Sequence, residues 1–514
     1  MNIGREKIVI LDFGSQYTQL IARRVRAHSV YSEILPFSAR LKDIKKDGLK
    51  GIILSGGPHS IYEKGAPFVD KSILKLGIPL LGICYGHQML SYVSGGNVEG
   101  AKEREYGYAE VFIDKKDKLL RGIPKRSRVW MSHSDKVLKL PPDFLSLAHT
   151  ENTRFAVVKH KSLPIYGLQF HPEVTHTKNG DRIFSNFLFL ICRCREDWNM
   201  ESFIAASRRG IQKRVRKGKV ILGLSGGVDS TVTSILTKQS IGKRVFVVFI
   251  NNGLLRKGEV LFVLKNFKKL FSDNFVYVDA EKEFLSALKG VKNPERKRKI
   301  IGNTFIKVFE REAKKIKGIR FLAQGTLYPD RIESMPVKGP SSVIKSHHNV
   351  GGLPQNMHLK LIEPLKDLFK DEVRKVGKLL GLPAHIITRH PFPGPGLGVR
   401  ITGEITKKRL KILRESDSIF IEEIKRSGLY KKIWQAFCVF LPVKTVGVMG
   451  DRRTYENVIA LRAVTSEDGM TADWFPFSKR FLTRVCNRII NEVPGVNRVV
   501  YDISSKPPAT IEWE

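Results

Sequence analysis

Short runs of β-branched and aliphatic residues alternate with longer amphipathic stretches through much of the chain. Between Lys7 and Cys194, the runs KIVILDFG, GIILSGG and IPLLGICYG are separated by helix-like stretches such as QLIARRVRAH. Strands of about four to eight residues separated by amphipathic helices are typical of parallel sheets with crossover connections. The pattern therefore predicts an α/β fold in which residues 7–197 form a first, doubly wound domain.

The same alternation resumes at VILGLSGGVDS, after a highly charged stretch between residues 193 and 219. It continues to HPFPGPGLGVR, where closely spaced prolines and glycines interrupt regular structure. We therefore expect a second doubly wound parallel-sheet domain over residues 198–389. Residues 390–514 mix helical patterns with β-rich runs such as KTVGVMG and VIALRAV, which predicts a small α+β domain.

Composition places the chain among ordinary globular proteins, with one exception. Hydrophobic residues make up 42% and charged residues 27%, but 89 Lys and Arg stand against 50 Asp and Glu, a formal charge of +39. An excess of this size suggests a nucleic-acid partner. Five scattered cysteines do not form a secreted disulfide framework, and no apolar run approaches the ~20 residues that cross a bilayer. We expect a cytoplasmic protein with no membrane partner.

A first candidate for chemistry surrounds Cys84 in GICYGHQML. The cysteine follows an apolar strand and precedes a helix, with Gly82 and Gly86 on either side, which is the layout of a nucleophile elbow. Thiols are mostly protonated at neutral pH, so a nucleophilic cysteine needs a base. His171 in YGLQFHPE is the best candidate, and Glu173 would orient its imidazole. The three residues predict a triad for acyl transfer.

Acyl transfer also needs hydrogen-bond donors for an oxyanion, and the backbone N–H groups of Gly57 in LSGGP and of Tyr85 would supply them. Taken alone, Cys84 would be interpreted as a small core residue. Taken together, the elbow, the GGP turn and the FHPE segment resemble the class I glutamine amidotransferases over roughly the first 190 residues. This resemblance implies that ammonia is released from glutamine through a thioester. It also implies that glutamine is held by Gln88, Ser132, Ser134 and Asp135.

A second candidate site is LGLSGGVDST, which follows the strand KVILGL and precedes an apolar helix. A glycine-rich turn at a helix N-terminus suits a phosphate, although an ordinary tight turn is the simpler alternative and the spacing is not that of a Walker A loop. SGGVDS resembles the pyrophosphate loop of the ATP pyrophosphatases, which adenylate a substrate oxygen. The implied ATP-binding residues are Ser225, Gly226, Gly227, Val228, Asp229, Ser230 and Thr231. Asp229 is also the candidate ligand for Mg²⁺ bound with ATP.

A glutaminase joined to an adenylating domain predicts an ATP-dependent amidation. Further stretches, among them AQGTLYPDRIES, HPFPGPGLGVR and GDRRTYENVIALRAV, extend the resemblance over the whole chain to the family of glutamine-hydrolysing GMP synthetases. That resemblance implies glutamine, XMP and ATP as substrates and a homodimer formed through the C-terminal domain. It implies XMP contacts at Arg298, Asp451, Lys506 and Glu512, and a lid residue at Lys345. His87 departs from the family's pattern and is interpreted as a packing residue.

Two other functions remain open at this stage. One is another glutamine-fed adenylating enzyme, acting on deamido-NAD or aspartate. The other is a tRNA-modifying or RNA-binding protein, which the +39 charge suggests. RNA-thiolating enzymes commonly carry CxxC pairs, none of which occurs in this sequence, and they would have no use for a glutaminase. We therefore expect no nucleic-acid partner, and we assign most of the charge to solvated runs such as KRVRKGK and ERKRK.

Overall fold

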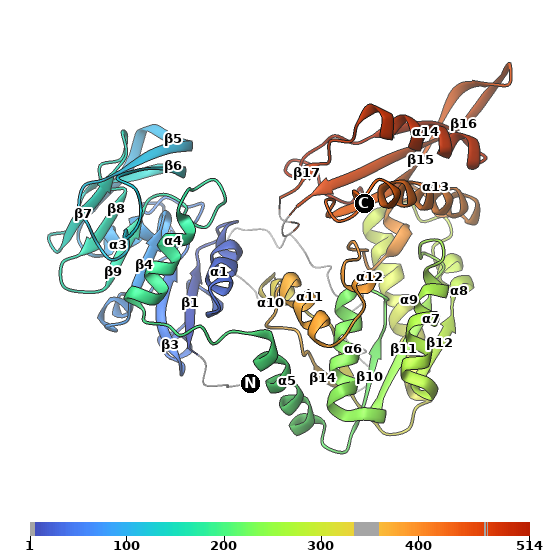
Figure 1. Cartoon of the computed structure of the whole chain (residues 1–514), viewed down its shortest axis with the longest axis horizontal. Helices are drawn as coiled ribbons and strands as arrows, with labels where there is room; N and C mark the ends of the chain where they lie inside the picture. The colour runs from blue at the N-terminus through green and yellow to red at the C-terminus, as the bar shows by residue number, and fades with distance from the viewer. Residues whose placement is uncertain (1–5, 334–358, 467–468, 470) are drawn as a thin grey trace. The chain divides into compact units, whose positions relative to one another are not determined.

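The computed structural model describes residues 6–333, 359–466, 469 and 471–514, and it divides into two compact units (Figure 1). Unit 1 ends at Phe203 and unit 2 begins at Ile204, within helix α5 (Met200–Val215). Among the helices of the described residues, none is both long enough and apolar enough to cross a membrane.

Unit 1 is built on a mixed sheet of nine strands in its described part, in the order β2-β1-β3-β4-β9-β8-β7-β5-β6. The strands are β1 (Lys7–Asp12), β2 (Tyr31–Pro36), β3 (Leu49–Leu54), β4 (Leu80–Ile83), β5 (Asn97–Ile113), β6 (Arg126–Lys139), β7 (Phe144–His149), β8 (Val157–His160) and β9 (Ile165–Leu168). The α-helices that accompany them are α1 (Thr18–Ala27), α2 (Leu41–Ile44), α3 (Tyr85–Val93) and α4 (Gly180–Ser185).

The strands from β2 to β9 in this order run parallel, as the sequence pattern predicts. Strands β1 and β4 are buried along almost their whole length, because strands of a parallel sheet with helices on both faces are shielded from water on both sides. The strand order changes direction between β1 and β3. In such sheets, ligands bind beyond the carboxyl ends of the strands near this point. A ligand is therefore expected at the loops after β1, β3, β4 and β9.

The other side of the sheet, from β8 to β6, is antiparallel, which the expectation of a purely parallel sheet did not include. Its main pair is β5 and β6. The sequence RSRVWMSHSDKVLK of β6 alternates buried with exposed or half-buried positions, the period-two pattern of an antiparallel strand with one face toward the core. The first domain is therefore α/β with a mixed sheet.

Unit 2 begins with a parallel sheet of five described strands in the order β12-β11-β10-β13-β14. These strands are β10 (Lys219–Gly223), β11 (Val245–Asn251), β12 (Phe275–Asp279), β13 (Ile319–Ala323) and β14 (Lys360–Ile362). The helices of this part are α6 (Val228–Ile241), α7 (Glu259–Phe271), α8 (Glu281–Ala287), α9 (Pro294–Lys314), α10 (Tyr328–Glu333), α11 (Lys370–Leu379) and α12 (Ala384–Ile387). The order reverses between β10 and β13, which confirms a doubly wound sheet and marks the loop after β10 as a ligand position.

The remainder of unit 2 has an α+β architecture, as expected. It consists of α13 (Lys407–Arg426), β15 (Gln435–Met449), β16 (Arg452–Thr465), β17 (Asp473–Trp474), α14 (Lys479–Glu492) and β18 (Val496–Tyr501). One hydrophobic core includes Val248 of β11, Phe420 of α13 and Ile459 of β16, so it extends through both parts of unit 2. The domain boundaries at residues 197/198 and 389/390 stay predictions.

Candidate active sites

Cys84 occupies a strained turn between β4 and α3. Its backbone has φ of 52° and ψ of −106°, a conformation that L-residues rarely adopt and that is enriched at functional sites. Its N–H donates to the carbonyl of Leu168 at 2.7 Å. A Cβ on Gly82 would lie 2.6 Å from the backbone of Gly86, and a Cβ on Gly86 would overlap the backbone of Leu54. Only glycine fits at these two positions, which explains the composition of the elbow.

His171 and Glu173 follow β9, the strand next to β4. The Nδ1 of His171 lies 2.7 Å from the Oε1 of Glu173, and both side chains are buried. Burial acts to lower the pKa of His171, but the charges of Glu173 and Cys84 outweigh it, and the pKa lies well above its ordinary value. The structure therefore brings Cys84, His171 and Glu173 together, with a base adjacent to the thiol that accepts a proton readily.

The two candidate oxyanion donors flank this turn. Tyr85 is the first residue of α3, so its N–H has no acceptor within the helix. Its side chain points away, because the phenol donates to the carbonyl of Pro67 at 2.8 Å. Gly57 lies in the loop after β3, where an added Cβ would be 3.4 Å from the Cγ of Tyr85. Gly57 therefore lies beside the Tyr85 ring.

The residues expected to hold glutamine are only partly brought together. Gln88 is buried on α3 and donates from Nε2 to the backbone carbonyl of Asp135 at 2.7 Å. The carbonyl of Ser132 lies 3.6 Å from the Sγ of Cys84. Ser132 and Ser134 lie on one face of β6, whereas the Asp135 side chain is buried on the other, where it accepts a hydrogen bond from the Tyr62 hydroxyl at 3.0 Å.

Three further residues lie near Cys84. The sequence identified neither Gln169 nor Tyr17 as a site residue, and it assigned His87 to packing. Gln169 donates from Nε2 toward the Sγ of Cys84 at 3.9 Å, and its only signal in the sequence is its place two residues before His171. The ring of Tyr17 contacts His171 edge-on, with centroids 5.0 Å apart. His87 is fully buried against Gly167, and burial lowers its pKa to about 3. The ring therefore stays neutral at pH 7, which agrees with its interpretation as a packing residue.

The second site surrounds the loop between β10 and α6. Gly226 has φ of +75°, and the hydroxyls of Ser225 and Ser230 lie 3.0 Å apart. The Ser225 hydroxyl also accepts from the N–H of Gly227 at 3.3 Å. The loop therefore ends at the N-terminus of a 14-residue helix, where free N–H groups and the helix dipole favour a phosphate.

Val228 and Thr231 of this loop turn their side chains into the core. Both are buried on α6, and the N–H of Thr231 donates to the carbonyl of Gly227 at 3.1 Å. The backbone N–H of Thr231 is thereby used, whereas that of Val228, the first residue of α6, has no acceptor within the helix and is available to a nucleotide. The basic side chain of Arg389, which no sequence motif marked, donates to the carbonyl of Gly226 at 3.1 Å and pairs with Glu259 at 2.6 Å.

Asp229 has the contacts expected of a carboxylate that shares Mg²⁺ with a nucleotide. One oxygen pairs with Lys370, while Oδ1 is buried and has no hydrogen-bond partner among the described residues. Mg²⁺ bound to a nucleotide commonly takes one or two carboxylates together with the phosphates. The described residues include no group of three His, Cys, Asp or Glu side chains suited to a metal, so this single carboxylate fits such a shared ion and not an all-protein cage.

The expected XMP contacts lie in three places within unit 2. Arg298 donates to the backbone carbonyl of Glu514, in the C-terminal tail that also carries Glu512. Lys506 donates to the carbonyl of Gly469 at 2.7 Å. Asp451 is exposed at the turn between β15 and β16, and no hydrogen bond or ion pair among the described residues joins it to the other three. Lys345 lies outside the described residues.

Glu512 is held by two residues that the sequence did not identify. Its carboxylate accepts from Nε and Nη2 of Arg400 at 3.0 and 2.8 Å, and from Gln435 at 2.7 Å. Arg400 is fully buried and stacks over the ring of Phe437, 4.1 Å from its centroid. These contacts fix the position of the tail.

Three known families match successive parts of the chain. They are described as glutamine amidotransferase class-I over residues 9–191, NAD synthase over residues 201–295, and GMP synthase C terminal domain over residues 422–513. The first match contains the Cys84 site, and the second contains the loop after β10.

Several curated relatives are similar over their whole length. The protein from Aquifex aeolicus is 58% identical over 99% of this chain and 100% of its own. Those from Brachyspira hyodysenteriae and Thermosipho africanus are each 56% identical, over 99% of this chain and 99% of their own. All three bear the name GMP synthase [glutamine-hydrolyzing].

Proposed function

The chain belongs to the family of glutamine-hydrolysing GMP synthases, and on that premise we propose that it converts XMP to GMP with glutamine and ATP. Glutamine, water, XMP and ATP would give glutamate, GMP, AMP and pyrophosphate. The observation that carries the proposal is the strained Cys84 beside the His171–Glu173 pair, in one chain with a phosphate loop. Whole-length identity to GMP synthases disfavours deamido-NAD or aspartate as the acceptor, although the family matched at residues 201–295 is NAD synthase.

Glutamine hydrolysis would take place in unit 1. His171 accepts the thiol proton of Cys84, and the sulfur attacks the carbonyl carbon of the glutamine side chain. The N–H groups of Gly57 and Tyr85 stabilise the oxyanion, and His171 gives its proton to the departing ammonia. His171 then activates the water that splits the thioester to glutamate, while Glu173 supports the imidazolium in both steps.

Adenylation would take place in unit 2. The loop from Ser225 to Ser230 holds the phosphates of ATP against the N-terminus of α6, while an oxygen of XMP attacks the α-phosphorus and pyrophosphate leaves. Asp229 would hold Mg²⁺, which neutralises charge on the leaving pyrophosphate when bound. Arg389 adds a cation beside the loop. Ammonia then displaces AMP from adenylyl-XMP. Arg298, Asp451, Lys506 and Glu512 are the proposed XMP contacts, and Lys345 the proposed lid residue.

We also propose a homodimer formed through the C-terminal part of unit 2. Val446 and Tyr455 lie opposite one another on the β15–β16 hairpin, and Val448 follows on the same face. Their exposed fractions are 45%, 66% and 75%, which is high for apolar side chains. A second copy would cover them. Sedimentation at micromolar concentration should give twice the mass of one chain, and a Val448→Glu variant should sediment as a monomer.

A cytoplasmic location forms part of the same proposal. All five cysteines are free thiols. Cysteines stay in this form in a reducing compartment such as the cytoplasm. The glutaminase step also requires that Cys84 stay reduced. Fractionation of cells that express the chain would test this location.

A Cys84→Ala variant tests the proposed reaction directly. It should lose glutamine-dependent formation of GMP and keep formation of GMP from ammonium salts, because adenylation does not use the thiol. Cys486→Ala is the matched control, since Cys486 is half-buried on α14 and far in the sequence from either motif. Absence of GMP formation by the unaltered protein with either nitrogen source would contradict the proposal, as would full glutamine-dependent activity of Cys84→Ala.

A further inference from the structure

Two buried glutamines form a hydrogen-bonded chain that ends on the sulfur of Cys84. Gln169 donates from Nε2 to Sγ at 3.9 Å, and its Oε1 accepts from Nε2 of Gln88 at 3.4 Å. Gln88 also donates to the carbonyl of Asp135 at 2.7 Å. Because Oε1 of Gln169 accepts from Gln88, Nε2 of Gln169 becomes a stronger donor to the sulfur. The donor at the end of this chain fixes the position of the Cys84 sulfur.

The far end of the chain is anchored by a buried ion pair. The carbonyl of Asp135 also faces Nδ1 of His133 at 3.0 Å, and Nε2 of His133 lies 3.0 Å from Oε2 of Glu105. Glu105 accepts hydrogen bonds from the hydroxyls of Thr150 and Thr153. Both nitrogens of His133 therefore face oxygen atoms, and Glu105 accepts two hydroxyl hydrogen bonds beside it.

The pKa of Glu105 favours its carboxylate form. Burial acts to raise it, but the hydrogen bonds from His133 and Thr153 and the charge of His133 outweigh burial, and the pKa lies below its ordinary value. A buried pair of this kind costs desolvation free energy and adds little net stability compared with an apolar pair. None of its members touches Cys84 directly.

We infer that Gln169 and the Glu105–His133 pair are positioning residues for the glutaminase reaction: Gln169 holds the Cys84 sulfur, and the ion pair fixes the Asp135 carbonyl that orients Gln88. The inference rests on the proposed role of Cys84 as the nucleophile. It adds Gln169, His133 and Glu105 to the site and gives the buried ion pair a function.

A Gln169→Met variant removes the donor and keeps the volume of the side chain. Loss of one hydrogen bond to a charged sulfur should lower kcat for glutamine-dependent GMP formation about tenfold. KM for glutamine should stay within about twofold, because the lost contact is to the nucleophile and not to the substrate. The rate at which iodoacetamide alkylates Cys84, followed on the Cys84 peptide by mass spectrometry, should fall by a similar factor.

A Glu105→Gln variant tests the other end of the chain. It removes the carboxylate charge opposite His133 and weakens the contact that holds the imidazole; kcat with glutamine should fall about threefold to tenfold. Glu110→Gln is the matched control, since Glu110 lies on the same strand in an exposed pair with Arg126 and should leave all rates unchanged. Formation of GMP from ammonium salts should be unchanged in all three variants.

Other results would overturn the inference. Unchanged kcat and alkylation in Gln169→Met would do so, and so would a rise in KM alone, which would mark a substrate contact. An equal loss of ammonium-dependent activity would indicate general damage to the fold instead of positioning. Full glutaminase activity of Cys84→Ala would contradict the proposed function itself. This result is separate from those that would overturn only the present inference.

Discussion

At the scale of single residues, the glutaminase site depends on backbone that only glycine can provide. Cys84 is held at positive φ, and at each of the two glycines beside it a Cβ would overlap neighbouring backbone atoms. Positive φ at a cysteine is unfavourable by about 1–3 kcal/mol and persists because the surrounding contacts hold it. The elbow therefore tolerates little change.

Gly86→Ala should damage the elbow without affecting unit 2. The new Cβ would overlap the carbonyl of Leu54, which is backbone and cannot rotate away. We expect unit 1 to lose about 1–3 kcal/mol of stability, and displacement of Cys84 by about 1 Å to lower glutamine-dependent activity about 100-fold. Kinetic assays with glutamine and with ammonium salts would measure this.

Gly95→Ala is the control for that variant. Gly95 has a φ of +94° but open space around its Cβ position, so this variant has backbone strain without overlap. It should lose some stability and keep its glutaminase rate. Equal glutaminase losses in both variants would show that general destabilisation, and not displacement of the elbow by overlap, is responsible.

His87 should make the stability of unit 1 depend on pH. Its folded pKa of about 3 lies below its unfolded value of about 6.5, so the full stability is present above pH 6.5 and is lost as pH falls toward 3. The slope should be about 1.4 kcal/mol per pH unit. Hydrogen exchange of the β1 amides between pH 6.5 and 4 should show this slope, and His87→Leu should reduce it by that amount. An unchanged slope in the variant would contradict burial of a neutral His87.

The sequence identified those site residues whose signal lies in contiguous motifs. Cys84, His171 and Glu173 each adjoin a strand end within a short recognisable segment, and the structure brings them together. Gln169 and His133 were not identified, because their roles depend on contacts between strands distant in the sequence. Spacing also cannot tell which face of a strand or helix a residue occupies.

At the scale of elements, the C-terminal tail is attached to unit 2 by buried cations. Lys297 pairs with Glu514, Arg400 with Glu512, and Arg462 with Asp502 and the carbonyl of Ser504. Each cation is fully buried, so the carboxylate with which it pairs offsets the cost of removing its charge from water. The terminal segment is therefore part of the packed structure of unit 2.

Removal of one partner of the Arg400–Glu512 pair should be more damaging than removal of both. Glu512→Gln leaves a buried guanidinium without its charge partner and should cost about 3–5 kcal/mol, measured by urea unfolding of unit 2. The double variant Arg400→Met, Glu512→Leu should be more stable than either single variant. Glu283→Gln breaks an exposed pair with Arg311 and should cost less than about 1 kcal/mol. If the stability lost in the double variant equalled the sum of the losses in the two single variants, Arg400 and Glu512 would not stabilise one another.

The pattern of strands was predictable in one half of the unit 1 sheet and not in the other. β1, β3 and β4 are short apolar runs between amphipathic helices, a clear signal for parallel strands. β5 and β6 contain many polar residues because one face is in contact with water, so the apolar runs that mark buried strands are absent. Their register depends on cross-strand contacts that a single sequence does not show.

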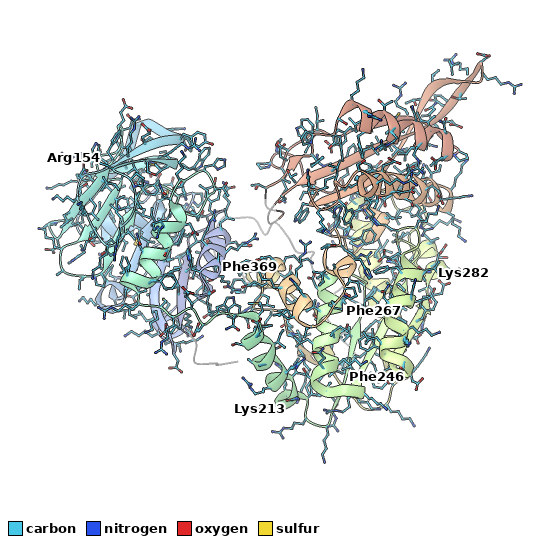
Figure 2. All side chains as sticks on the ribbon, viewed as in Figure 1. Arg154, Lys213, Phe246, Phe267, Lys282 and Phe369 are labelled. Atoms are coloured by element: carbon cyan, nitrogen blue, oxygen red, sulfur yellow. The ribbon has the colours of Figure 1, made fainter. Side chains whose placement is uncertain are left out.

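At the scale of the whole molecule, the positive charge is spread over exposed side chains. Lys213 on α5 and Lys282 on α8 are exposed and project from the outside of the ribbon (Figure 2). Few of the cations are needed for anionic substrates, since the candidate nucleotide contacts use a handful of them. Such a surface should bind polyanions without specificity at low ionic strength and release them as salt rises, because the interaction is mainly release of counterions.

The continuous core of unit 2 predicts how the chain unfolds. Val248 and Ile459 lie in the two parts that the sequence assigns to separate domains, yet both belong to one hydrophobic cluster, while Ile52 belongs to the core of unit 1. Residues of one core should unfold cooperatively. Scanning calorimetry should therefore show two transitions and not three.

Single substitutions assign the two transitions. Val248→Ala and Ile459→Ala create cavities in the same core, so both should lower the same transition, each by a few degrees, while the other stays in place. Ile52→Ala should lower only the other transition. A third transition that responds to Ile459→Ala alone would show that residues 390–514 unfold as an independent domain and that their shared core is too weak to couple them.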